Sequence, residues 1–297
     1  MEDAGHDDVE AFEAHRPALT GLAYRMLGDL GRAEDVVQEA WLRWNGRIVS
    51  VDEPRGYLVQ VVTRLCLNEL TSARARREES RSDRLPEPVD LEASGLDQAE
   101  MLDRISMAFL VLLQRLTPLE RAVLLLHDVF DLRHAEIARM LDRSEAACRQ
   151  LLSRARNHVQ HERRVFETSP DQHREVLAAF LRAFREGATE DLLALLTDDA
   201  TLIIDAGPGG RRVGRIRSVS KPVHGARRIA ALLSAVVREG QMTGPYVERV
   251  LNGQPSIIRI RDGRAVTVVS VGVAEGKIHS VFVQVDPSRL GHLGSLQ

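Results

Sequence analysis

The sequence is poor in aromatic residues and cysteine and has no long apolar run. Aromatic residues make up 4% of the chain, so we expect a core built of Ala, Leu and Val. The two cysteines, Cys66 and Cys148, have neither CxxC nor metal-ligand spacing, which favours buried thiols over a disulfide or a zinc site. No apolar stretch approaches the roughly 18 residues of a membrane span, and the acidic N-terminus is unlike a signal peptide. We therefore expect a cytoplasmic globular protein without a metal, a cofactor or a membrane partner.

Charge is distributed unevenly along the 297 residues, although the net charge is only −3. Residues 1–40 contain ten Asp or Glu residues against three Arg residues, whereas residues 74–84 and 143–164 are rich in Arg. Phosphate binding needs a local cationic surface, because charge interactions are screened within about 10 Å at ordinary salt concentrations. The acidic first part is therefore a better candidate for a protein interface than for a nucleic-acid interface.

The length predicts two or three compact units, and the first is a helical module at 7–77. Apolar residues within 19–26 recur with the spacing of one helix face. Trp41 and Trp44 fall on an apolar helix face, so we expect core residues rather than residues that stack on bases. Residues 78–98 are polar, contain two prolines and lack a sustained period, which predicts a flexible linker.

A second helical module is expected at 99–165. Thr117, Pro118 and Glu120 combine an N-cap, a proline at the first helical position and a capping-box glutamate, which together predict a helix start. The helices expected at 134–141 and 145–161 form a helix-turn-helix, and the inward stripe of the second comprises Cys148, Leu151, Leu152, Ala155 and Val159. Its outward residues suit a DNA groove: Glu145, Ala146, Arg149, Gln150, Ser153, Arg154 and Arg156. From this pattern alone, a solvated helix of a bundle stays an alternative.

From about 171 to 290 the pattern becomes α+β. Two helical segments lead into a strand-like TLIID segment, a glycine-rich loop, another helix and four further strand-like segments. Turn sequences NGQ, DG and EG separate those strands, which is typical of hairpins. We expect an antiparallel sheet with helices on one face.

This last domain offers three candidate acid–base groups, Asp205, His224 and His279. Their mutual geometry cannot be derived from sequence, so an enzyme, a small-molecule-binding domain and a protein-contacting domain all stay open. The 207–210 loop lacks the GK[ST] ending of a phosphate-binding loop, so we interpret it as a turn or contact loop.

Three segments together resemble the extracytoplasmic-function (ECF) sigma factors of the sigma-70 family. Residues 12–44 (FEAHRPALTGLAYRMLGDLGRAEDVVQEAWLRW) are similar to region 2 of that family, and 53–70 (EPRGYLVQVVTRLCLNEL) to its promoter −10 helix. Residues 116–156 (LTPLERAVLLLHDVFDLRHAEIARMLDRSEAACRQLLSRAR) are similar to region 4, which reads the −35 element. Two long matches in the family's order are more specific than either helix pattern.

The resemblance implies partners and roles. The partners are core RNA polymerase, with its beta and beta-prime subunits, and promoter DNA. The acidic helix would dock on polymerase through Glu34, Asp35, Gln38 and Glu39. The loop at 45–56 would capture a flipped −10 base, and the helix after it would face the non-template strand with Arg55, Gln60, Thr63, Arg64 and Asn68. The helix at 145–161 would lie in the −35 major groove.

The C-terminal part resembles a SnoaL-like domain of the NTF2-like fold, which one group of these sigma factors carries. The supporting segments are LPEP at 85–88, DAGPGGR at 205–211 and VDPSRL at 285–290, each a variant of the group's motif. We expect the glycine-rich loop and the linker to meet, so that this domain controls the placement of the DNA-binding modules. The residues expected at that regulatory contact are Leu85, Pro86, Glu87, Pro88, Asp205, Gly207, Gly209, Gly210 and Arg211.

The sequence therefore predicts a multidomain protein: two all-α sigma modules, namely a region 2 helical bundle and a region 4 helix-turn-helix, followed by an α+β NTF2-like cone. The predicted function is promoter-specific transcription initiation, regulated in cis by the last domain, with no catalytic activity. An ordinary DNA-binding regulator and a SnoaL-like enzyme with a DNA-binding appendage are the alternatives. A small-molecule ligand of the last domain stays open.

Overall fold

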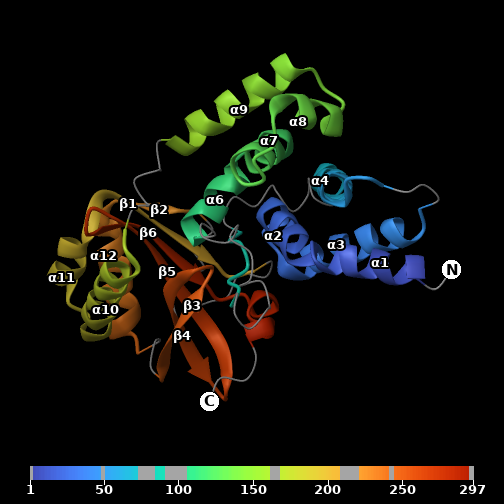
Figure 1. Ribbon diagram of the computed structural model, residues 1–297. Helices are drawn as coiled ribbons and strands as arrows, with labels where there is room; N and C mark the ends of the chain where they lie inside the picture. The colour runs from blue at the N-terminus through green and yellow to red at the C-terminus, as the bar shows by residue number, and fades with distance from the viewer. Residues whose placement is uncertain are drawn as a thin grey trace. The chain divides into compact units, whose positions relative to one another are not determined.

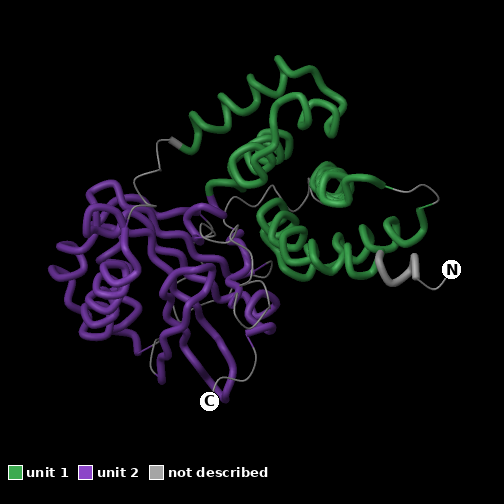
Figure 2. Tube along the Cα trace, in the orientation of Figure 1, with its two compact units in different colours: residues 1–80, 92–105, 112–161 green, residues 81–91, 106–111, 162–297 purple. Residues whose placement is uncertain are grey.

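The computed structural model describes residues 3–47, 51–72, 84–90, 106–160, 168–207, 221–240 and 244–293. The chain forms two compact units, drawn in two colours in Figure 2. Unit 1 comprises Met1–Ser80, Glu92–Ile105 and Leu112–His161, and unit 2 comprises Arg81–Leu91, Ser106–Val111 and Glu162–Gln297. The two predicted helical modules thus share one unit, and the described part of the predicted linker belongs to the other. Among the described helices, none has the length and apolar content that a membrane crossing needs.

The first four helices of unit 1 are α1 (Asp3–Glu13), α2 (Arg16–Leu27), α3 (Leu30–Asn45) and α4 (Pro54–Thr71). Gly28, in the left-handed region at φ 69°, ends α2, and the Asp29 side chain caps α3 by accepting from the Arg32 amide. Trp44 is 1% exposed, and its indole donates to the Asp8 carbonyl at 2.8 Å. The prediction that Trp44 is a core residue is confirmed.

The later helices are α6 (Met107–Arg115), in which the unit boundary falls, α7 (Pro118–Asp128), α8 (His134–Leu141) and α9 (Glu145–Gln160). The capping box of Thr117 and Glu120 at the start of α7 is confirmed. Arg121 of α7 is 3% exposed and donates to the carbonyls of Leu113, at 2.7 Å, and of Met26 in α2. The guanidinium therefore ties the first helical module to the second within unit 1.

Unit 2 has helices α10 (Pro170–Glu186), α11 (Thr189–Leu195) and α12 (Ala226–Arg238). Its described residues form the strands β1 (Leu196–Asp205), β2 (Val223–His224), β3 (Tyr246–Leu251), β4 (Gln254–Arg261), β5 (Arg264–Ala274) and β6 (Lys277–Gln284). Short 3-10 helices follow at η3 (Pro287–Arg289) and η4 (Gly291–Leu293). Helices α10, α11 and α12 lie together on one side of the sheet (Figure 1). The predicted architecture, helical modules followed by an α+β domain, is confirmed.

The strand order is β2-β1-β6-β5-β4-β3, and β1 pairs with β6 in parallel. The prediction of a purely antiparallel sheet is therefore wrong at this one pairing. The reason is the connection: α12 and three hairpin strands separate β1 from β6, which is long enough for the crossover that parallel strands require. The hairpin pairings β3–β4, β4–β5 and β5–β6 are antiparallel, as the turn sequences predict.

The sheet buries apolar side chains on both faces. On the helix-covered face, Leu202 and Val281 join the main core with residues of α10 and α12. The next residues along the same two strands, Ile203 and Phe282, point to the opposite face because side chains alternate along a strand. There they pack with Leu85 and with the first residues of α6. A segment of the predicted linker is thus part of the second face of this domain.

Candidate nucleic-acid interface and linker-binding site

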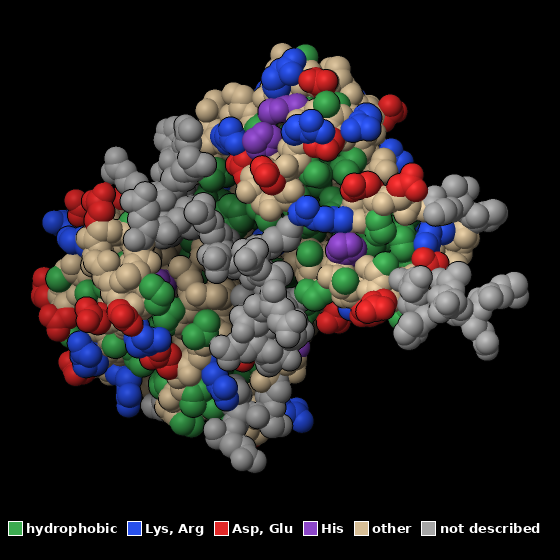
Figure 3. Space-filling model, viewed as in Figure 1, with side chains coloured by type: hydrophobic (Ala, Val, Ile, Leu, Met, Phe, Trp, Pro, Cys, Tyr) green, Lys and Arg blue, Asp and Glu red, His purple; other side chains and the backbone are tan. Residues whose placement is uncertain are grey.

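Helix α9 presents most of the predicted DNA-contacting residues to solvent. Its inward stripe is buried, apart from the partly buried Leu151, and Cys148 and Ala155 are 0% exposed. The exposed side chains are Glu145, Ala146, Arg149, Gln150, Ser153 and Arg154. Basic and histidine side chains gather over α7, α8 and α9, with acidic ones among them (Figure 3). This face can offer Arg and Gln donors to base edges and positive charge to phosphates.

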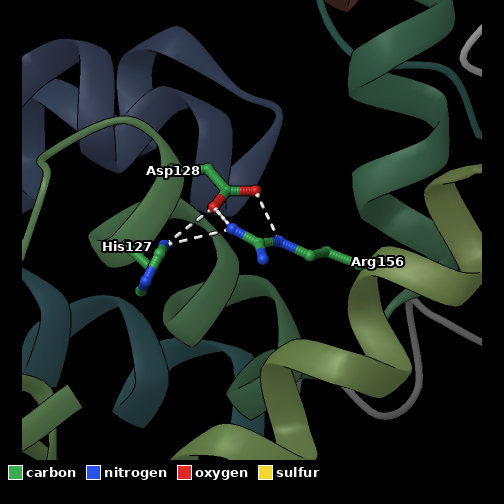
Figure 4. A network of polar contacts seen from close by, with 3 residues as sticks. All are labelled: His127, Asp128 and Arg156. Carbon is green, nitrogen blue, oxygen red and sulfur yellow. Dashed lines mark hydrogen bonds and ion pairs between the residues drawn. The ribbon is translucent and has the colours of Figure 1, made fainter. Parts of the chain in front are cut away.

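Arg156 differs from the other predicted contact residues, because it is only partly exposed and its guanidinium is bound to another helix. Its Nη2 and Nε donate to Asp128 at the end of α7, at 2.5 and 3.3 Å, and Nη2 lies 3.3 Å from Nδ1 of His127 (Figure 4). Burial alone would raise the pKa of Asp128, but hydrogen bonds from Arg156 and His127 outweigh it and hold that pKa below its ordinary value. Arg156 therefore ties α9 to α7, and whether it also contacts DNA stays a prediction.

His134, the first residue of α8, lies beside His127 on this surface. Its ring centroid lies 4.8 Å from that of His127. Burial lowers the pKa of His134, and the positive charges of His127 and Arg149 lower it further. The imidazole thus stays neutral more readily than an isolated histidine, because it lies among other cations.

The predicted −10 residues of α4 do not share one exposed face. Arg55, Arg64 and Asn68 are exposed and Gln60 is half-buried. Thr63 is 0% exposed, and its hydroxyl donates to the Val59 carbonyl at 2.7 Å. The expectation that Thr63 faces DNA is therefore wrong in this structure, because its place on the helix turns it into the core.

Arg64 faces the second helical module. Its Nε donates to the carbonyl of Met140 in α8 at 3.0 Å. In this arrangement of unit 1 the Arg64 side chain is engaged by α8. The loop predicted to capture a base, 45–56, is described except for residues 48–50.

The predicted polymerase-binding residues on α3 are all exposed: Glu34, Asp35, Gln38 and Glu39. Glu39 also pairs with Arg43 one turn later, at 2.9 Å. Val36, Val37 and Ala40 are buried on the other side of the helix. The face is therefore polar, largely acidic and available for a protein contact, as the sequence pattern predicts.

Asp205 at the end of β1 binds the linker. The Leu85 amide donates to its Oδ2 at 3.0 Å, and the Gln284 side chain donates to the same oxygen at 3.1 Å. Oδ1 accepts from the Gly207 amide at 2.9 Å. Leu85 is 1% exposed and Asp205 4% exposed, so this contact is buried within unit 2. The predicted contact of the linker with the glycine-rich loop stays a prediction, because most of that loop lies outside the described residues. The structure places a linker hydrogen bond at Asp205, directly before the loop.

Gly207 follows in a conformation that only glycine adopts readily, with φ 73°. A Cβ atom there would lie 2.6 Å from Cγ of Asp286. Glycine therefore lets the start of the loop pass close to the segment after β6. Gly209, Gly210 and Arg211, also predicted at the regulatory contact, lie outside the described residues.

Sequence reasoning missed two residues that hold the same linker segment. The Val89 amide donates to Oδ1 of Asn252 at 3.0 Å, and the Asn252 amide donates back to the Val89 carbonyl at 2.8 Å. His292 lies 2.6 Å from the Pro88 carbonyl through Nε2 and 2.7 Å from Oε1 of Glu87 through Nδ1. The Asn252-Gly253 pair is typical of a hairpin turn and gives no sign of the contact with Val89. No pattern near His292 indicates its contact with Pro88.

The three candidate acid–base groups do not converge. His224 pairs in register with Thr201, four residues from Asp205, which corresponds to about 13 Å along the strand. Asp205 pairs with Gln284, five residues from His279, which corresponds to about 16 Å. Within the described ranges, no group of three His, Cys, Asp or Glu side chains is arranged to hold a metal ion.

Comparisons with known proteins agree on one family. The family model "Sigma-70 region 2" matches residues 11–76, and "Sigma-70, region 4" matches residues 106–159. The probable ECF RNA polymerase sigma factor SigI of Mycobacterium tuberculosis is 34% identical over 97% of this chain and 97% of its own length. SigJ of the same organism is 33% identical over 95% of this chain and 93% of its own length. The crystal structure of M. tuberculosis SigJ has a TM-score of 0.73 and 32% identity, and the match covers 95% of this chain and 98% of that one.

Proposed function

Because the chain belongs to the ECF RNA polymerase sigma factors, we propose that it binds core RNA polymerase and directs promoter-specific initiation, with its C-terminal domain regulating it in cis. The observation that carries this proposal is the order of the two sigma modules, region 2 before region 4. The similarity to SigI extends over 97% of both chains and therefore includes the C-terminal domain. The acid–base candidates of that domain do not converge, so the proposal assigns it no catalytic activity. A small-molecule ligand of the domain stays a prediction.

Each helical module supplies one part of the proposed function. The exposed polar face of α3 would contact polymerase, and the exposed α4 residues Arg55, Arg64 and Asn68 would contact the −10 strand. The exposed face of α9 would read the −35 element, as the second helix of a helix-turn-helix does in a major groove. Exposure of these faces supports the assignment.

Regulation would act through the linker. Residues 85–89 are held by three side chains of the C-terminal domain, namely Asp205, Asn252 and His292. Pro86 and Pro88 are buried in the same contact. A linker bound in this way has less reach than an unbound one, so the domain can limit how the two DNA-binding modules separate.

Run-off transcription with purified core polymerase tests the function, on a promoter selected by genomic binding. Full-length protein should give transcripts from one start site that require both core polymerase and the chain. A matched reaction with a 1–168 truncation should change the yield, because that variant lacks Asp205, Asn252 and His292. Specific promoter binding without polymerase, together with no transcript from either form, would instead identify an ordinary DNA-binding regulator.

A further inference from the structure

His292 faces two hydrogen-bond acceptors at once. Nε2 lies 2.6 Å from the carbonyl oxygen of Pro88, and Nδ1 lies 2.7 Å from a carboxylate oxygen of Glu87. A neutral imidazole carries one N–H, so it can donate to only one of the two oxygens. The other contact would then bring a nitrogen lone pair against an oxygen lone pair. Both contacts form only when the histidine–glutamate pair holds one proton more than a neutral ring and a carboxylate.

We propose that His292, Glu87 and the Pro88 carbonyl form a proton-dependent clamp that holds the linker on the C-terminal domain. In the closed clamp the ring is an imidazolium that donates to both oxygens. When the ring loses a proton to solvent, one N–H remains for Pro88, and the Nδ1 lone pair repels the carboxylate of Glu87. The linker contact therefore weakens as the pH rises through the titration of this ring.

The charged groups around the His292 ring lie on the linker, on β5 and on η3, and Glu87 of the linker is the carboxylate in contact with the ring. Glu87 is 8% exposed, whereas the His292 side chain is 25% exposed, so the contact is screened on the side of the ring and shielded on the side of the carboxylate. Strand β5 packs against η4, and its one charged residue, Arg264, is exposed. Helix η3 also packs against η4 and contributes Arg289, which is 5% exposed, while the Asp286 carboxylate before it caps η3 by accepting from Ser288.

The adjacent linker contact has no titratable group of its own. Val89 is held by Asn252, whose amide side chain does not titrate. Any pH dependence of the linker contact that disappears on changing His292 or Glu87 therefore belongs to the clamp. The clamp is a property of unit 2 alone, and it goes beyond the proposed function because it needs neither polymerase nor DNA.

Amide hydrogen exchange of the full chain between pH 5.5 and 8.5 tests the clamp, with the Leu85 and Val89 amides as reporters. We expect their protection factors, corrected for intrinsic exchange, to fall as the pH rises. The fall should be up to about tenfold per pH unit and should begin where the ring loses its proton in the open clamp, because opening then releases one proton. His292→Gln should make the profile flat. Glu87→Gln should also make it flat but keep the protection, since the amide can donate to Nδ1 of a neutral ring. His158→Gln, an exposed histidine of α9, should keep the wild-type profile.

A flat wild-type profile, or an unchanged pH dependence in His292→Gln, would overturn the proposal. Exchange of the β5 amides reports whether a variant still folds, and the Glu87→Gln variant keeps the test decisive if His292→Gln unfolds unit 2. Failure of the sigma function would appear only in the run-off assay. The two failures are therefore distinguishable.

Discussion

Asp205 illustrates how one carboxylate fixes the linker. Its Oδ2 accepts from Leu85 and Gln284, and the Leu85 amide is buried with it. Asp205→Ala leaves that amide without this acceptor, and we expect the free energy of unfolding of unit 2 to fall by about 1–3 kcal/mol. Urea denaturation measures the loss, and exchange of the Leu85 amide localises it. Asp198→Ala, at an exposed position of the same strand, should cost much less, and equal losses in the two variants would contradict the role of Asp205.

Single residues also show where sequence reasoning stops. The apolar stripe of α9 follows from its spacing, and its burial confirms the pattern. The same spacing predicts an outward Arg156, and the family resemblance implies that Thr63 faces DNA. Arg156 is instead held by Asp128, which lies 28 residues earlier, and Thr63 turns into the core. A partner that is distant in the sequence leaves no periodic signal, so the Arg156 contact could not be predicted. Thr63 is a different case, because its hydroxyl donates to the carbonyl of Val59, four residues earlier on the same helix.

At the scale of one element, two arginines of α9 should behave differently. Arg154 is exposed, whereas Arg156 is paired with Asp128. We expect Arg154→Ala to reduce the slope of log affinity against log salt by about 0.9, because one phosphate contact is lost. Arg156→Ala should change the slope less and lower the free energy of unfolding by up to about 1 kcal/mol, since the lost ion pair is partly exposed.

Fluorescence titrations of −35 DNA at several salt concentrations measure both slopes, and urea denaturation gives the stabilities. Arg238→Ala, which changes an exposed arginine of α12 in the C-terminal domain, serves as the control and should leave the slope unchanged. A slope change for Arg156→Ala as large as that for Arg154→Ala would show that Arg156 leaves Asp128 to bind a phosphate.

The helix-and-sheet layer of unit 2 contains two histidines that should make its stability depend on pH. Burial lowers the pKa of His173 on α10 and of His279 on β6, although the Pro255 carbonyl and Asp199 act in the opposite direction. An unfolded histidine titrates near about 6.5. The folded state therefore binds fewer protons, so this contribution to stability is present above about pH 6.5 and is lost as the pH falls towards the lower folded pKa.

Denaturation at pH 5 to 7.5 should show the free energy of unfolding of unit 2 falling as the pH is lowered. The slope should decrease in His279→Gln, whatever the absolute stability of that variant. His158→Gln should leave the slope unchanged, because that ring is exposed. The sign is opposite to that of the His292 clamp, which weakens as the pH rises.

Whole elements were more predictable than their pairings. Apolar period and capping residues indicate the helices, and turn pairs such as Asp262-Gly263 indicate the hairpins, where Asp262 has φ 53°. The parallel pairing of β1 with β6 joins segments more than seventy residues apart. Local patterns specify how a strand begins and ends, but the neighbour of an isolated strand is selected by packing of the complete sheet.

At the scale of the whole chain, four predicted segments form two compact units. The linker composition is polar, yet Leu85 and Val89 are 1% and 0% exposed in unit 2. The apolar residues of this segment have no sustained period, so the pattern alone does not indicate that it docks, and only the family resemblance does. In unit 1, Arg121 and Arg64 connect the two helical modules by donating to main-chain carbonyls. A main-chain acceptor leaves no pattern in the sequence, so these contacts could not be predicted.

If α4 and α9 bind the −10 and −35 elements as proposed, the packing in unit 1 conflicts with simultaneous contact to both. Elements named −10 and −35 are separated by roughly 25 base pairs, or about 85 Å at about 3.4 Å per base pair. In unit 1, Arg64 of the −10 helix touches α8 of the −35 module at 3.0 Å. We infer that the modules separate when both elements are bound, so contacts within unit 1 oppose promoter engagement.

Arg121→Met tests this inference. The change removes hydrogen bonds from a buried guanidinium to the carbonyls of Leu113 and Met26, at an expected cost of about 1–3 kcal/mol per unmet buried group. Fluorescent labels at Leu42→Cys and Arg154→Cys, both exposed positions, should report lower transfer efficiency in this variant. The native thiols are buried, and burial raises the pKa of Cys66 and of Cys148, so labelling is confined to the introduced cysteines.

The matched control is Arg139→Met, which removes an exposed guanidinium of α8 and should leave the transfer efficiency unchanged. If opening of unit 1 precedes promoter binding, Arg121→Met should also raise the affinity for DNA that carries both elements, with core polymerase present. It should not raise the affinity for DNA that carries the −35 element alone, because that site needs only α9 and its supporting helices. A variant with reduced transfer efficiency but equal gains on both DNAs would show that the Arg121 contact stabilises unit 1 without controlling access to the promoter.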